Sequence, residues 1–111
     1  MITVTIHRSN DSYAGFKVVG HAGYAEEGYD IICAAVSVLV VNAVNSIETF
    51  TDDKFAARED HGIVELILEG SVSDKTTLLL DSMILGLRDI QTQYGNEFIR
   101  LKIEEIGRAH V

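Results

Sequence analysis

Cysteine, proline and tryptophan are what this 111-residue chain has least of: it contains one cysteine and neither of the other two. A single cysteine cannot form an intramolecular disulfide, which favours a reducing compartment. None of the four histidines has metal-ligand spacing with that cysteine, which argues against a structural zinc site. We therefore expect no metal and no cofactor.

Basic residues are also few, since nine Lys and Arg face 17 Asp and Glu and give a formal net charge of -8. This balance argues against a phosphate-backbone binder, and no phosphate-cradling glycine motif is present, so we expect no direct contact with nucleic acid. The longest nearly uncharged stretch, 31–47, is short and carries polar residues, which argues against a membrane span. The first residues lack the features of a secretory signal. We expect a cytoplasmic protein.

The pattern of apolar residues predicts five strands and two helices in the order ββαββαβ. The alternating strands need cover on one face only, so the fold class is α+β, a two-layer sandwich of one mostly antiparallel sheet with both helices on a single face. There is no repeat, and we expect one domain over residues 1–106 with a loose tail at 107–111. The predicted strands are 2–7, 13–20, 54–59, 63–69 and 98–104, and the predicted helices are 31–47 and 73 or 74 to 94.

Local signals support these elements. Asp60-His61-Gly62 is typical of a hairpin turn, with glycine at a position that needs positive φ. Ser73 or Asp74 is expected to start the second helix and Gly95 to end it.

The predicted helix 31–47 is apolar nearly all the way round, and such a helix is buried on more than one side. In a domain of this size one sheet covers only one side of it. The other side must meet the second helix, a partner subunit or both. This is the argument from composition for a homodimer.

The stretch 20–37, GHAGYAEEGYDIICAAVS, holds the only cysteine. His21 follows the second strand, the loop 22–29 is expected to be mobile, and Asp30 is a good N-cap residue. Cys33 would then be the third helical residue, where free backbone N–H groups and the helix dipole favour a thiolate. A cysteine and a histidine so placed have the composition of a nucleophile and its base.

Plainer interpretations stay open for the same residues. A lone cysteine near the start of a buried helix is often a small core residue, and His21 can equally be a surface or capping histidine. Ser37, one turn after Cys33, can donate to the sulfur or bond the carbonyl four residues back. The other histidines are expected to be solvated.

The run 20–37 resembles the Prp family, the small ribosomal-processing cysteine proteases of bacteria. The resemblance rests on Gly20-His21-Ala22, on Gly28 and Asp30, and on the Cys-Ala-Ala-Val-Ser of 33–37. Chain length and element order agree with the family over the domain, but not beyond Ile106.

The resemblance implies a cytoplasmic homodimer that removes a short N-terminal extension from a large-subunit ribosomal protein, cutting after an aromatic pair and ahead of a basic segment. By the same resemblance Cys33 is the nucleophile and His21 the general base. The loop 22–29 would clamp the peptide, and its Glu26 and Glu27 would suit the basic segment. The positions that match residues around the site are Gly20, Ala22, Gly28, Asp30 and Ser37.

Two competing hypotheses belong to other classes. One is a non-catalytic peptide-binding module of ribosome assembly that uses the 22–29 loop, with Cys33 merely packed. The other is a thiol sensor, which would oxidise Cys33 without turning over any peptide.

Overall fold

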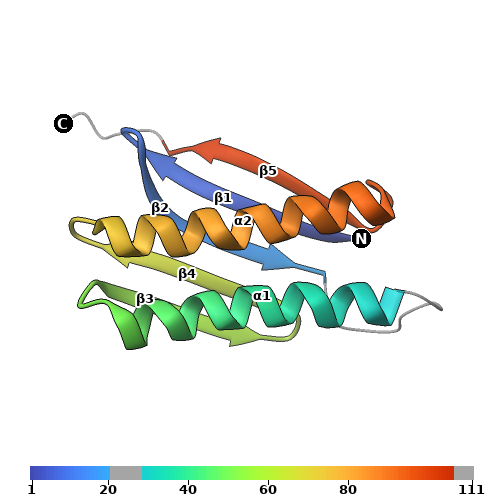
Figure 1. Cartoon of the computed structure of the whole chain (residues 1–111), viewed down its shortest axis with the longest axis horizontal. Coiled ribbons are helices and arrows are strands. Elements are labelled where there is room, and N and C mark those ends of the chain that lie inside the picture. Colours follow the sequence, from blue (N-terminus) through green and yellow to red (C-terminus); the bar gives the residue numbers. More distant parts are fainter. Residues whose placement is uncertain (21–28, 107–111) are drawn as a thin grey trace.

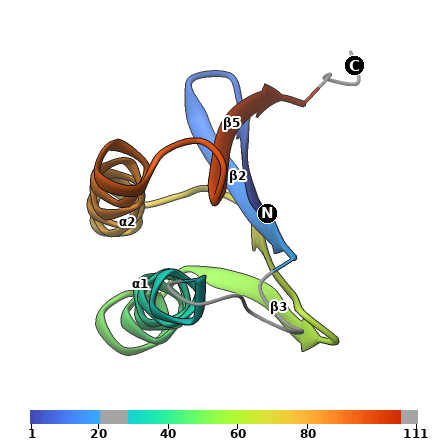
Figure 2. The same cartoon turned by 90° about the vertical axis from the view of Figure 1, so that its right-hand side faces the viewer.

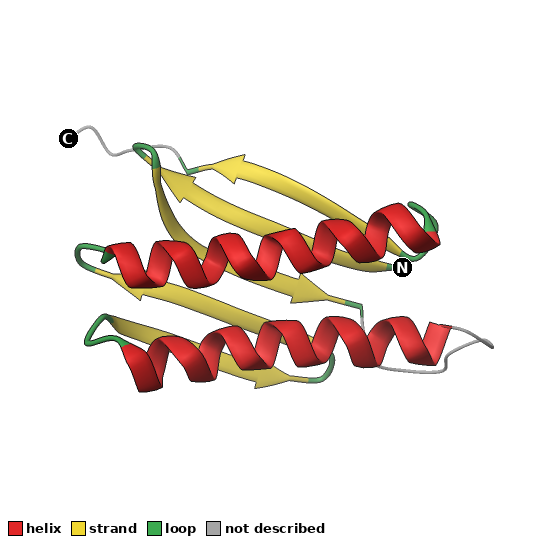
Figure 3. Ribbon diagram, in the orientation of Figure 1, coloured by secondary structure: helices red, strands yellow, loops and turns green. Residues whose placement is uncertain are grey.

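The structure, a computed structural model, describes residues 1–20 and 29–106, which form one sheet and two long helices in the predicted order (Figure 1, Figure 3). The predicted tail 107–111 lies outside the described residues. The strands are β1 (Ile2–Ser9), β2 (Ser12–Val19), β3 (Lys54–Asp60), β4 (Ile63–Glu69) and β5 (Ile99–Glu105), and the helices are α1 (Tyr29–Phe50) and α2 (Asp74–Tyr94).

The sheet has the strand order β3-β4-β2-β1-β5. Its pairs are antiparallel except β1 with β5, which run parallel, so the predicted mostly antiparallel sheet is confirmed. Both helices cover the same face of the sheet, as predicted, and Figure 2 shows them on one side of the strands. The helices run in opposite directions, with the start of α1 and the end of α2 at the same end of the molecule (Figure 1).

Two tight turns connect the strands of the β1–β2 and β3–β4 hairpins. Asn10 and Asp11 between β1 and β2 have φ of 52° and 63°, and His61 and Gly62 between β3 and β4 have φ of 45° and 81°. A two-residue loop with positive φ at both positions matches the right-handed twist of the flanking strands. The predicted turn at 60–62 is confirmed.

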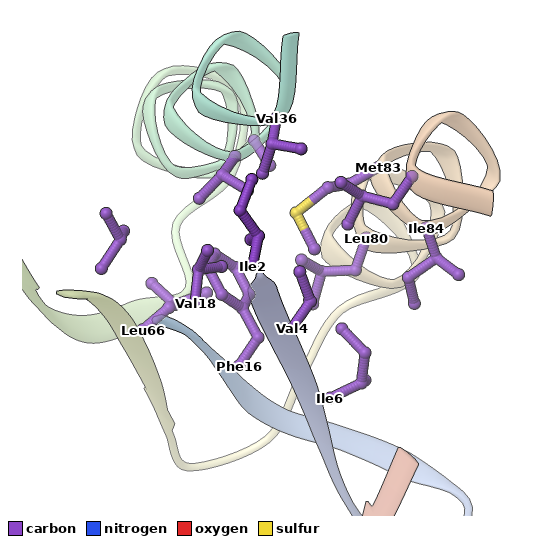
Figure 4. Close-up of a cluster of buried hydrophobic side chains, with 14 of the residues drawn as sticks. Ile2, Val4, Ile6, Phe16, Val18, Val36, Leu66, Leu80, Met83 and Ile84 are labelled. Atoms are coloured by element: carbon purple, nitrogen blue, oxygen red, sulfur yellow. The ribbon is translucent and has the colours of Figure 1, made fainter. Parts of the chain in front are cut away.

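The core lies between the inner face of the sheet and the two helices. In Figure 4 the side chains of β1 and β2, such as Val4 and Phe16, point toward Val36 of α1 and Leu80 of α2. The buried apolar residues of α1 fall three or four positions apart, which is the spacing of one helix face. They are Ile32, Val36, Val40, Ala43 and Ile47, each at most 4% exposed.

The apolar composition of α1 exceeds what the sheet can cover. By length and apolarity alone the segment Ile31–Phe50 would be able to cross a membrane, yet one face of it packs against the sheet in the core of the domain. A second flank meets α2, where Leu39 lies against Gly86. Ile31 and Val38 stay 66% and 67% exposed, so the predicted excess of apolar surface is present.

Helix α2 starts and ends where the sequence predicts. Ser73 is its N-cap, and its hydroxyl accepts a hydrogen bond from the Thr76 N–H at 3.3 Å. Gly95 is the C-cap.

The Asp53 carboxylate supports the N-cap, because it accepts hydrogen bonds from the N–H and the hydroxyl of Ser73 at 2.9 and 2.8 Å. Hydrogen bonds from the hydroxyl of Thr76 and the backbone of Ser73 lower the pKa of Asp53.

Candidate active site

Cys33 is half-buried in the first turns of α1 and packs against the hydrophobic core. Helix α1 begins at Tyr29, so Asp30 lies inside the helix and Cys33 is its fifth residue. The prediction that Asp30 is the N-cap and Cys33 the third helical residue is therefore wrong. The helix begins two residues earlier than predicted, at Tyr29 and not at residue 31. The free N–H groups of the first turn belong to residues before Ile32, and Cys33 follows in the second turn, where the effect of the helix dipole is weaker.

Gly20 anchors the end of β2 just before His21. Its φ is 96°, and its N–H donates to the Gly62 carbonyl at 3.2 Å. A Cβ at this position would lie 2.4 Å from the carbonyl oxygen of Met1, which is backbone and cannot rotate away. The chain therefore requires a glycine here for both conformation and space.

The end of β2 and the start of α1 lie at the same end of the molecule (Figure 1). The fold thus brings Gly20 and Cys33 to one end of the sheet although thirteen positions separate them in the sequence. His21, Ala22, Gly28 and the loop up to residue 28 lie outside the described residues, and so does the side chain of Asp30.

Cys33 lies on the flank of α1 that faces β3, away from α2. Leu39 marks the α2 flank, because its side chain lies against Gly86. Val44 follows Cys33 by eleven residues, close to three full turns, and lines a groove together with Ala57 of β3. Ser37, one turn after Cys33, is half-buried and lines a shallow hollow with Val41. Two residues on the same side of α1 as Cys33, Val44 and Ser37, therefore each line a depression of the surface.

The remaining described histidines lie in other settings. The His7 imidazole is 3.2 Å from the Glu104 carboxylate on the neighbouring strand, and His61 is 3.2 Å from Asp60 with 94% of its side chain exposed. Among residues 1–20 and 29–106, no group of three or more His, Cys, Asp or Glu side chains could hold a metal ion. His110 lies outside this part of the chain.

A family model described as "Cysteine protease Prp" matches residues 1–99. The chain belongs to the Prp family of cysteine proteases. It is 34% identical to the ribosomal processing cysteine protease Prp of Bacillus subtilis, over 85% of this chain and 90% of that protein. It is 32% identical to the protein of the same name from Staphylococcus aureus, over 91% of this chain and 97% of that one.

Solved structures of the Prp family share the fold. The essential Prp protease of S. aureus in complex with a substrate peptide matches with a TM-score of 0.87 and 30% identity, over 94% of this chain and 100% of that one. Its complex with a covalently linked product peptide matches with a TM-score of 0.83 and 31% identity, over the same shares of the two chains. Family and fold together make this chain a cysteine protease.

The sequence predicted the site residues of the Prp motif, but it gave no sign of the two backbone carbonyls that lie next to Gly20. The Met1 and Gly62 carbonyls come from distant parts of the chain, and a backbone oxygen carries no residue-type signal. The only available hint was the glycine itself, at the end of a strand pattern.

Proposed function

We propose that this chain removes the short N-terminal extension of a large-subunit bacterial ribosomal protein, with Cys33 as nucleophile and His21 as general base. The observation that carries this proposal is the single cysteine of a Prp-family chain, half-buried at the start of α1. The related proteins from B. subtilis and S. aureus carry the name of ribosomal processing proteases, which supports the substrate class.

The reaction follows ordinary thiol chemistry. His21 takes the proton of the Cys33 thiol, and the sulfur attacks the scissile carbonyl to form a tetrahedral intermediate. The C–N bond then breaks, and the leaving amine takes the proton from the His21 imidazolium. Water, deprotonated by His21, attacks the thioester, and the released thiolate regains the proton. The free N–H groups of the first turn of α1 are the candidate donors to the oxyanion.

The test uses a synthetic peptide that spans the extension and the first residues of the mature ribosomal protein. We expect a single cut by mass spectrometry with the intact protein and a loss of at least about 1,000-fold with Cys33→Ala or His21→Ala, because covalent and acid–base catalysis both fail. Binding by the intact protein without any cut would contradict the proposal and favour the peptide-binding module. Oxidation of Cys33 without peptide turnover would favour the thiol sensor.

The thiol itself gives an independent measurement. If Cys33 is activated, its alkylation by iodoacetamide should begin well below the pH at which an ordinary thiol, with a pKa near 8.5, reacts. The rate should lose this low-pH phase in His21→Ala. A profile equal to that of a free cysteine would remove the case for an activated nucleophile.

Two further properties belong to the proposal. A cytoplasmic location is supported by the substrate class and by the single cysteine of the chain, which cannot form an intramolecular disulfide. A homodimer is supported by the outward surface of the helix layer, which leaves Ile31, Val38, Leu78 and Leu85 between 64% and 68% exposed.

A further inference from the structure

We propose that the groove between α1 and β3 binds one apolar side chain of the peptide substrate, several residues from the bond that is cut. The inference rests on the proposed function, because the peptide in the groove is the one whose carbonyl reaches Cys33. It adds a specificity subsite at residues outside the family motif at 20–37.

The groove has a volume of about 220 Å³ and a mainly apolar lining. Val41 and Val44 of α1 form one wall, and Ala57 of β3 and Val64 of β4 lie opposite. This volume is below the range of about 300–1,000 Å³ that is typical of small-molecule and cofactor sites. It suits a single large aliphatic or aromatic side chain.

The groove exists because a small residue occupies an inward-facing position of the edge strand. Phe55, two positions before Ala57 and so on the same face, packs against the core. Ala57 follows with only a methyl group, opposite the fully buried Leu66. Between them on the chain, Ala56 points to the other face of the sheet; both alanines are exposed, and only Ala57 lines the groove.

Two charged residues line the groove, Arg58 and Glu59. The guanidinium of Arg58 is held by the Glu65 carboxylate at 3.1 Å. The remaining charged residue of the lining is Glu59, a carboxylate that disfavours an anionic ligand. The rest of the lining, apart from the amide of Asn45, consists of the aliphatic side chains of Val41, Val44, Ala57 and Val64, and these suit an apolar group.

The groove lies further along α1 on the same side of the helix as Cys33. Ser37, one turn from the cysteine, lines a hollow with Val41 and Asn45, and these two residues also line the groove. At 1.5 Å per helical residue, Val41 and Val44 lie about 12 to 16 Å from Cys33 along α1. An extended peptide covers about 3.3 Å per residue, so the side chain in the groove is about four or five residues from the scissile bond.

Strand β3 supplies a reason for the peptide to be extended. It is the terminal strand of the sheet, and an edge strand offers backbone groups that pair with an added strand. A peptide beside β3 presents alternate side chains to the helix side, where the groove lies.

The test compares Ala57→Leu, which fills the groove, with Ala56→Leu, which adds the same side chain to the opposite face of the same strand. The substrates are the spanning peptide and versions with alanine at each of the five positions on either side of the cut. We expect Ala57→Leu to raise KM for the spanning peptide about tenfold, the effect of losing one buried apolar side chain. Ala56→Leu should leave KM unchanged.

A subsite also predicts coupling. In the unmodified protein one distant apolar position of the peptide should raise KM on replacement by alanine, and in Ala57→Leu that replacement should have no further effect. Iodoacetamide should alkylate Cys33 at the same rate in both variants. The proposal is overturned if Ala57→Leu leaves KM unchanged, if it slows alkylation or cleavage of every peptide equally, or if light scattering shows that it alters the subunit number instead.

Binding separates this inference from the proposed function. In a Cys33→Ala background, isothermal titration should show about tenfold weaker binding of the spanning peptide when Ala57→Leu is added, and no change with Ala56→Leu. If the intact protein binds through the groove but cuts nothing, the proposed function fails and the subsite stands. If it cuts and the two variants bind equally, the subsite is wrong and the proposed function stands.

Discussion

Gly20 is fixed by backbone contacts of the fold and directly precedes His21, the proposed general base. Its left-handed φ and the Met1 carbonyl oxygen both exclude a side chain, and its N–H holds the Gly62 carbonyl. The chain therefore leaves the sheet for His21 from a point fixed by β1 and by the β3–β4 turn. A base that must meet a thiol within hydrogen-bond reach needs such a starting point.

We predict that Gly20→Ala lowers kcat/KM for the peptide by at least about tenfold, because β2 or β1 must shift to accommodate the methyl group. It should also weaken the low-pH phase of Cys33 alkylation. The matched control is Gly15→Ala on the same strand, whose Cβ would lie 2.1 Å from the Leu66 carbonyl oxygen.

Both substitutions should lower Tm, since both force a backbone clash at a positive φ. Gly15→Ala should leave the alkylation profile unchanged in the protein that remains folded. An identical profile for the two variants would mean that Gly20 serves the fold alone.

At the scale of elements, a polar contact holds β2 against α2. The hydroxyl of the buried Tyr13 donates to the Asp81 carboxylate, and the Arg8 guanidinium lies 4.7 Å from the centroid of the Tyr13 ring. Burial, followed by the hydrogen bond to Asp81 and its negative charge, raises the pKa of Tyr13 from 10.0 to about 12. The folded protein thus favours the neutral phenol.

This shift predicts a loss of stability in alkali. Below pH 10 Tyr13 is neutral in the folded and the unfolded protein, and its contribution to the free energy of unfolding is complete. This contribution is lost as the pH rises from 10 toward 12, because in that range only the unfolded chain ionises. The loss is on the order of 2–3 kcal/mol. Tyr13→Phe should flatten the dependence of the unfolding free energy on pH in that window, measured by urea titration.

Tyr94→Phe is the control, since it removes an exposed tyrosine hydroxyl of α2. At neutral pH Tyr13→Phe should cost about 1 kcal/mol, the usual value of a lost hydrogen bond. Equal alkaline slopes for Tyr13→Phe and the unmodified protein would show that another group controls this window.

At the scale of the molecule, the helix layer leaves apolar side chains in solvent. Ile31 and Val38 of α1 and Leu78 and Leu85 of α2 are the most exposed of them. We predict a mass near 24 kDa, twice the 12.2 kDa of one chain, by light scattering at micromolar concentration.

The double substitution Val38→Glu and Leu85→Glu should shift this mass to that of a monomer, because two carboxylates would be buried without partners. Ile67→Glu is the matched control, since Ile67 is 52% exposed on a strand of the sheet. A monomeric unmodified protein, or an equal shift with Ile67→Glu, would exclude a dimer through the helix layer.

Much of the architecture could be predicted because its signals are local. The alternation in β1 and β4, the turn at 60–62 and the Ser73 cap each depend on residues within a few positions of one another. The start of α1 was missed by two residues, because a good N-cap residue type such as Asp30 favours a helix start without fixing it.

Residue type and spacing were enough to predict the element order, the candidate chemistry of Cys33 and the family resemblance. The surroundings of these residues depend on how the chain folds. The tertiary structure brought the Met1 and Gly62 carbonyls to Gly20, turned Cys33 toward β3 and opened a groove beside Ala57. These contacts join residues far apart in the chain. Positions of backbone atoms and of a groove cannot be predicted from residue types alone.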